Sequence, residues 1–529
     1  MKTKVVSTVL TGAFALVVTL ILFFVNVIVA QLPPLRIDLT STHQYGLSEA
    51  THKVVGRLAD RLKIEAYFTR DLPAPYNGHA AYLRDMLEEY AAYAHGNLTF
   101  EFIDPGTDEA RKREIMMKGI APLQIQEVRD DQIGIKQGFM GLVITYGTRK
   151  ETIPVVRDVE NLEYELTSVI KKLTASELRT VAFTAGHGEI APQEKMQRLR
   201  AELSKNYGVV SHDFATAKEI PSNISTLVIV GPTEKWSDEH LFALDQFLMK
   251  GGTVAFLLDD VKVDFHKLSE AKDMDHGLYD ILAFWGVKPE QDLIVDPHCS
   301  HINLEAQQGP IRMRNTVKYP YISAVTNLNR EHILTKDVGT LSLPFLSSLS
   351  LASNIPNLTH TVLARTSDKS WQEKAPYDIN PLERKVRPQA AVSGPFSVAV
   401  AVTGKFASFF SNKAGKEDAP DYLKDSAKVL KESPETRILV VSDSSLAQDE
   451  LSNPDDTVFV TNVIDWLAQD SEMIKIRNRG LSEKPIAELQ PTVRQILRYA
   501  NVLGVPLLFI LFGLGRWQWR KARLRNFKL

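Results

Sequence analysis

A glycine-rich segment, Gly186-His187-Gly188-Glu189, holds the residues of this chain that are best suited to chemistry. It follows the apolar run 180–185, which is predicted to be a β-strand. A histidine beside a carboxylate can transfer protons or contribute to a metal site. In open α/β sheets, ligands bind beyond the carboxyl ends of the strands, and this segment lies at such an end.

Acidic residues end three further predicted strands. They are Asp259 and Asp260, Asp296, and Asp443 with Ser444 and Ser445. We expect these strand ends to meet at one edge of a parallel sheet. The candidate ligand-binding residues are therefore His187, Glu189, Asp259, Asp260, Asp443 and Ser444. The simpler alternative is structural: the glycines form a turn, while His187 and Glu189 cap the next helix or hydrogen-bond the loop.

Motifs of known enzyme classes give no support for catalysis. The sequence contains no GxSxG nucleophile elbow, and no cysteine follows a strand as it does in glutaminases. Gly404-Lys405 lacks the upstream glycine of a Walker A motif, so the chain is not expected to hydrolyse ATP. We assign no catalytic residue and no cofactor, and the protein is predicted not to be an enzyme.

The one cysteine, Cys299, cannot form an internal disulfide bond. It lies between His298 and His301, which raises the question of a metal site. Three such residues within four positions are a weak signal, and no second group with zinc-like spacing occurs in the sequence. We therefore predict no metal.

Two uncharged stretches near the ends predict membrane anchors. Residues 5–30 contain no charge and exceed the length of about 20 residues that spans a bilayer as a helix. The segment 499–519 reaches that length when its aromatic end is included. The proposed interfacial anchors are Trp517, Trp519, Arg520 and Lys521. The alternatives are a cleaved signal peptide for the first stretch and a buried core helix for the second.

Charge gives the expected orientation. The tail 520–529 is basic, and Lys2 and Lys4 precede the first stretch, so both termini are expected in the cytoplasm. The net charge is −2, and without the eight basic residues of the two tips residues 31–515 carry −10. An acidic body argues against nucleic-acid binding. We predict a bacterial inner-membrane protein with a large periplasmic or extracellular body.

The intervening residues are too many for one core, so at least two domains are expected. Residues 36–175 follow the order β-α-β-α-β-β-α, which is the thioredoxin-like order, although no CxxC motif is present. Residues 176–480 alternate strands and helices, which predicts a mostly parallel α/β domain. An insertion is expected at about 300–390, and 481–498 is expected to form a linker.

Several segments together resemble the auxiliary component of an ABC transport system of the gliding-motility-associated, GldG-like type. They are IDLTSTHQYGLSEAT near the start, FIDP (102–105), GHGE, MKGGTVAFLLDD (249–260), LAFWGVKPEQDLIVD (282–296), AVTGKFASFF (401–410), ILVVSDSSL (438–446) and NVIDWLAQDSEMIKIRNR (462–479). The resemblance implies a periplasmic body whose second part is similar to class I glutamine-amidotransferase folds. It also implies two partners, a cytoplasmic ATPase and a polytopic permease.

Three hypotheses follow. The leading one is a non-catalytic auxiliary subunit that binds a substrate, the cell wall or another envelope protein and docks on a permease. The second is a membrane-anchored hydrolase that uses the strand-end residues, and the third is a structural envelope scaffold.

Overall fold

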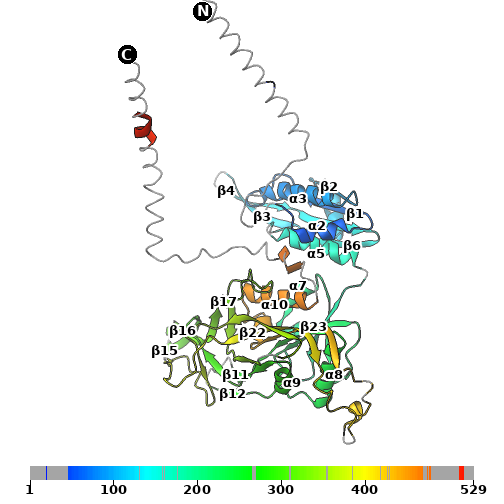
Figure 1. The fold of residues 1–529 in the computed structure, drawn as a ribbon. Coiled ribbons are helices and arrows are strands. Elements are labelled where there is room, and N and C mark those ends of the chain that lie inside the picture. Colours follow the sequence, from blue (N-terminus) through cyan, green and yellow to red (C-terminus); the bar gives the residue numbers. More distant parts are fainter. Residues whose placement is uncertain are drawn as a thin grey trace, which may run out of the picture. The chain divides into compact units, whose positions relative to one another are not determined.

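The computed structural model describes residues 46–468 with short gaps, together with Leu20 and residues 473–474, 476–477 and 512–517 (Figure 1). The gaps are 130–131, 158, 160, 176, 265–269, 309–310, 353–354, 384, 417–418, 426 and 428. The chain divides into two compact units, 1–482 and 483–529. Apart from Leu20 and 512–517, both predicted membrane spans lie outside the described residues. Within the described part of the chain, no helix combines the length and apolar character that crossing a bilayer requires.

The first part of the chain builds a four-stranded sheet of order β2-β1-β5-β6. Its elements are α2 (Glu49–Gly56), β1 (Leu62–Phe68), η1 (Tyr76–Gly78), α3 (His79–Tyr93), β2 (Leu98–Ile103), α4 (Glu109–Met117), β3 (Leu123–Arg129), β4 (Gln132–Gly138), β5 (Met140–Tyr146), β6 (Arg149–Ile153) and α5 (Leu162–Thr174). β1 is parallel to β2 and antiparallel to β5, which is antiparallel to β6. From β1 onward the predicted β-α-β-α-β-β-α order is present, with one addition that the sequence analysis missed, the hairpin β3–β4.

The two faces of this sheet differ in chemistry because side chains alternate along β1. Leu62, Ile64 and Phe68 point to one face and form a core with α2, α3 and α5. On the other face Tyr67 packs against Ile115 of α4. Ser48 caps α2 by accepting the N–H of Thr51.

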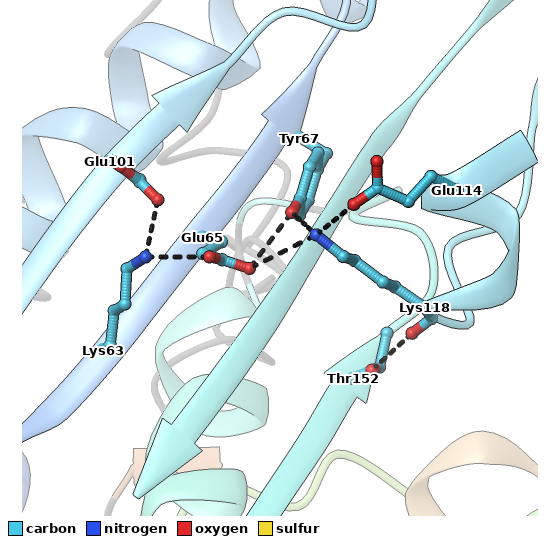
Figure 2. Close-up of polar contacts among 7 residues, drawn as sticks. All are labelled: Lys63, Glu65, Tyr67, Glu101, Glu114, Lys118 and Thr152. Carbon is cyan, nitrogen blue, oxygen red and sulfur yellow. Dashed lines mark hydrogen bonds and ion pairs between the residues drawn. The ribbon is translucent and has the colours of Figure 1, made fainter. Parts of the chain in front are cut away.

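Figure 2 shows the polar network on that second face. Lys63 Nζ lies 2.9 Å from Glu65 and 2.8 Å from Glu101. Lys118 Nζ donates to the Tyr67 hydroxyl over 2.7 Å, and that hydroxyl donates to Glu65 over 3.1 Å. Since these charges are partly exposed and are paired with one another, each pair contributes at most about 1 kcal/mol. The network therefore lies on the partly exposed area of the face that α4 also covers.

The second part of the chain contains a ten-stranded sheet of order β13-β19-β22-β23-β10-β9-β7-β8, with β20 beside β22 and β17 beside β20. Its strands are β7 (Thr180–Ala185), β8 (Gly208–Asp213), β9 (Ile224–Val230), β10 (Thr253–Leu257), β13 (Val287–Pro289), β17 (Asn327–Leu328), β19 (Leu349–Leu351), β20 (Leu358–Arg365), β22 (Ser397–Ala407) and β23 (Glu432–Val441). Neighbours from β23 to β8 are parallel, whereas β22 and the strands beyond it pair antiparallel. The fold is thus mixed α/β.

Helices cover both faces of this sheet. They are α6 (Pro192–Lys195), α7 (Gln197–Leu203), α8 (Asp238–Met249), α9 (Tyr279–Phe284) and α10 (Pro454–Leu467), with the short helices η2 (Asp421–Leu423) and η3 (Ser445–Ala447). In Figure 1, α7 and α10 lie on one side of the strands and α8 and α9 on the other. An apolar core lies between the sheet and the helices on each face. β10 contributes Ala255 and Leu257 to the core on the α10 side, and Val254 and Phe256 to the core on the α8 side.

The strands of the region 300–390, which was expected to be an insertion, belong to different sheets. β15 (Cys299–Gln308), β16 (Ile311–Val325) and β18 (Leu341–Pro344) form a three-stranded sheet, while β17, β19 and β20 join the large sheet. Two small pairs complete the fold: β11 (Val261–Val263) with β12 (Ala271–Asp273), and β14 (Leu293–Val295) with β21 (Trp371–Glu373).

The two faces of β1 predict opposite effects of neighbouring substitutions. Ile64 is fully buried, so Ile64→Ala should cost about 2–5 kcal/mol and accelerate hydrogen exchange in β1 and β2. Lys63→Ala, at a half-exposed site on the other face, should change stability by less than about 1 kcal/mol. Hydrogen–deuterium exchange of the full-length chain measures both, and equal effects of the two substitutions would contradict the assigned faces.

Candidate functional site

Most candidate residues stand at one edge of the large sheet. Leu257 of β10 pairs with Val441 of β23 on one side and with Val230 of β9 on the other. Because these strands and β7 are parallel, the loops that follow them leave the sheet at the same edge, as expected. Asp296 is an exception. It follows β14, which pairs with β21 in another sheet, so the expectation that it shares this edge is wrong.

The His187 segment after β7 hydrogen-bonds itself. Glu189 accepts the backbone N–H of His187 over 2.6 Å, and its other oxygen lies 3.3 Å from His187 Nδ1. The side chain of Glu189 is 1% exposed. Burial opposes its charge, but the hydrogen bonds from His187 outweigh this effect and hold the pKa of Glu189 below its usual value. Gly186 and Gly188 have φ of 108° and 73°, which glycine adopts without strain.

The ring of His187 is fixed by residues that the sequence analysis missed. It stacks on Trp236 with centroids 4.2 Å apart, and its Nε2 lies 2.8 Å from Nδ1 of His240. Because the carboxylate of Glu189 can only accept, the Nδ1–H of His187 donates to it, and in this tautomer Nε2 of His187 accepts the Nδ1–H of His240. Burial lowers the pKa of His240.

Asp259 after β10 is bound by Ser444 after β23. The Ser444 N–H donates to Oδ1 of Asp259 over 2.8 Å, and the Ser444 hydroxyl donates to Oδ2 over 2.6 Å. Burial raises the pKa of Asp259 in spite of these two bonds. Ser444 and Asp259 are thus brought together as predicted, and they bond each other.

The carboxyl group of Asp443 has fewer hydrogen-bond partners than that of Asp259. It is 1% exposed, and its Oδ1 accepts the N–H of Ser445 over 2.6 Å. In the described part of the chain, its Oδ2 has no hydrogen-bond partner. Burial and the neighbouring Asp259 raise the pKa of Asp443 well above its usual value. This carboxyl therefore retains its proton at a pH where an exposed aspartate has lost it.

Asp260 pairs with His276 rather than with Ser444. Its Oδ1 lies 3.1 Å from Nε2 of His276, and both side chains are fully buried. The N–H of Leu278 donates to Nδ1 of His276 over 3.1 Å, so the ring proton is on Nε2 and faces Asp260. Although adjacent in sequence, Asp259 and Asp260 thus have separate partners.

The loop after β9 connects the His187 segment with the Asp259–Ser444 pair. A Cβ added at Gly231, which has a φ of 55°, would lie 2.9 Å from Ser444 Oγ and 3.1 Å from Ile190. Only glycine fits this close approach at a positive φ. The two groups of candidate residues therefore lie in neighbouring loops, each closed by its own hydrogen bonds.

His298, which precedes Cys299, also has a structural partner. His298 Nδ1 donates to the carbonyl of Ala324 over 2.5 Å, and burial raises the pKa of the Cys299 thiol. Among the residues that the structure describes, no group of three or more His, Cys, Asp or Glu side chains is placed to hold a metal ion.

The fold and the site define a mixed α/β protein whose strand-end acids are mainly bonded within the protein. Residues 178–467, more than half of the chain, match the family model described as an ABC-type uncharacterized transport system. The chain belongs to this family, and it is an auxiliary component of such a system. Residues 41–145 match a domain of unknown function, DUF7088.

An uncharacterized protein of Borreliella burgdorferi is 21% identical over 504 residues, which cover 91% of this chain and 93% of the relative. Among solved structures, the mmIFT52 N-terminal domain aligns with a TM-score of 0.33 and 14% identity, over 55% of this chain and 97% of that chain.

The geometry predicts a structural effect of removing His187. His187→Ala deletes a buried stacked ring and one partner of a buried carboxylate, so we expect a loss of about 2–4 kcal/mol. Glu239→Ala on α8, which breaks an exposed pair with Lys218, should cost less than about 1 kcal/mol. Thermal melts of the two variants measure this. A His187→Ala protein that melts like wild type but loses function would instead indicate a chemical role.

The unsatisfied oxygen of Asp443 predicts that Asp443→Asn increases the stability of the folded protein. At pH 8, Asp443→Asn should raise the melting temperature because asparagine avoids the free-energy cost of burying an acid that is ionised in the unfolded chain. Since the native pKa is raised, wild type gains stability as the pH falls towards the unfolded value of about 4, and the difference should shrink.

The matched control is Asp259→Asn. It places an amide N–H₂ against a donor of Ser444, so it should lower the melting temperature at both pH values. A lower melting temperature of Asp443→Asn at pH 8 would contradict the assignment of Asp443 as a buried, poorly satisfied acid.

Proposed function

We propose that this protein is a non-catalytic, membrane-anchored subunit of an ABC transport complex in the bacterial inner membrane. The segments 1–30 and 499–519 anchor it, both termini are cytoplasmic, and the body is periplasmic or extracellular. The family match to an ABC-type transport system supports this function, and the two uncharged stretches of the sequence support the anchoring.

The observation that favours binding over catalysis is the state of the strand-end acids. Glu189 and Asp259 each direct both carboxylate oxygens to donors of their own fold. A catalytic acid or base must reach a substrate proton within about 3 Å, directly or through one water. Residues that are bonded to one another and buried serve instead to hold the loops in which they lie.

The finer family and fold assignments belong to the same proposal. We assign the chain to the GldG-like type on the segments that carry that resemblance. The sheet order β2-β1-β5-β6, with α4 on the face opposite α3 and α5, supports a thioredoxin-like first domain. The parallel strands β23 to β8 between two helical layers support an amidotransferase-like second domain.

The partners are a cytoplasmic ATPase and a polytopic permease. The body binds a substrate, the cell wall or another envelope protein, and the anchors dock on the permease. Such a subunit influences ATP turnover only if it binds two states of the permease with different affinity.

Purification from native membranes tests this function. Full-length protein extracted in mild detergent should co-purify with an ABC ATPase and a permease, identified by mass spectrometry. A variant without 1–30 and 499–519 should lose both, because the anchors form the dock. Recovery of neither partner with intact full-length protein would contradict the proposal, and a truncated body that retains the permease would show that the anchors are not the dock.

A further inference from the structure

One surface loop exposes apolar side chains that the proposed function does not explain. We call residues 374–393, which follow β21, the apolar loop. In it Leu382 is 79% exposed, Val386 75% and Val392 59%. Single exposed apolar residues are common, but three large ones on one short loop mark an interaction site.

The apolar loop has a fixed base. Ile379 is fully buried, and its carbonyl accepts the Tyr319 hydroxyl over 2.7 Å. The carbonyl of Asp378 accepts the Tyr321 hydroxyl over 2.7 Å, and its carboxylate lies 2.6 Å from Lys385 Nζ. The exposed side chains are therefore presented on a preformed frame, which reduces the entropy lost on binding.

The far end of the loop is closed as well. Arg387 donates to the carbonyl of Ala391 and to the hydroxyl of Ser393. The N–H of Ala391 donates to the carbonyl of Pro388 over 3.2 Å. This turn closes the chain between Val386 and Val392, so both residues are held on one folded segment of the loop.

The charge of the loop is opposite to that of the body. Residues 374–393 contain four basic and two acidic side chains, a net charge of +2, whereas residues 31–515 carry −10. Lys374 and Arg387 are exposed. An anionic surface would be attracted to this loop and repelled by the rest of the body.

The small number of exposed apolar side chains on the loop favours a bilayer as the occupant. Three aliphatic side chains supply a few hundred square ångströms at most, less than the roughly 800 Å² per partner of a stable protein interface. Shallow insertion of apolar side chains beside basic residues that contact anionic headgroups needs no such area.

We propose that the apolar loop inserts Leu382, Val386 and Val392 into the anionic membrane surface that faces the body, with Lys374 and Arg387 at the headgroups. This rests on the proposed membrane anchoring. The loop then forms a contact between body and bilayer that is independent of the two anchors.

The test uses the full-length chain in lipid nanodiscs. In a Cys299→Ser background, Leu382→Cys carries an environment-sensitive nitrobenzoxadiazole label. With one quarter phosphatidylglycerol in phosphatidylcholine, the label should brighten at least two-fold relative to detergent and be quenched by spin-labelled lipid. Pure phosphatidylcholine should give a smaller effect, and Lys374→Glu should at least halve the quenching in anionic discs. The control is Leu430→Cys, a 42% exposed apolar site elsewhere, which should not respond.

The outcomes separate the two proposals. Failure of the chain to co-elute with nanodiscs would overturn both the anchoring and the loop contact. Co-elution without quenching at Leu382, or equal quenching at Leu382 and Leu430, would overturn the loop contact alone. Protection of the Leu382 label only when detergent-extracted membrane proteins are added would assign the loop to a protein partner and overturn the proposal.

Discussion

The second part of this protein depends on buried aspartates that each take both a backbone N–H and a hydroxyl from one serine. The pairs are Asp259 with Ser444, Asp292 with Ser348, and Asp296 with Ser367. A buried carboxylate without donors costs several kcal/mol, whereas each hydrogen bond to a charged group contributes about 1.5–3 kcal/mol. The partners are 56 to 185 residues apart, so each pair joins segments that the local sequence leaves independent.

The same constraint decides what the edge of the sheet can do. A carboxylate that accepts two bonds from one serine has a fixed orientation and little capacity left for a substrate. Glu189 is fixed in the same manner by His187. Asp443 differs because burial without a second donor favours its neutral form, so at this position the fold lowers the cost of burial by keeping a proton. The edge thus combines carboxylates of fixed orientation with two acids, Asp259 and Asp443, whose pKa values burial raises.

The sequence predicted the positions of helices and strands more reliably than which strands and side chains they contact. The strand predicted at 180–185 is β7, and the serines at 48 and 237, a residue type common at helix N-caps, cap α2 and α8. The hairpin β3–β4 had a readable signal, the alternation of Leu123 and Ile125, and was missed. The bond between His187 and His240 spans 53 residues and had no local signal. The same holds for β17, β19 and β20, because the choice of a neighbouring strand depends on packing across the sheet.

The first part of the chain, which contains α5, is joined to the second part, which contains α10, by a buried cation. This cation is Arg477, which is 5% exposed and contacts both α5 and α10. Its guanidinium lies 2.8 Å from Asp465 and donates to Asn462 of α10 over 2.8 Å, and it donates to Tyr164 of α5 over 2.6 Å. Breaking a buried pair of this kind costs about 3–5 kcal/mol. One buried guanidinium therefore couples α5 to α10, two helices that are far apart in the sequence.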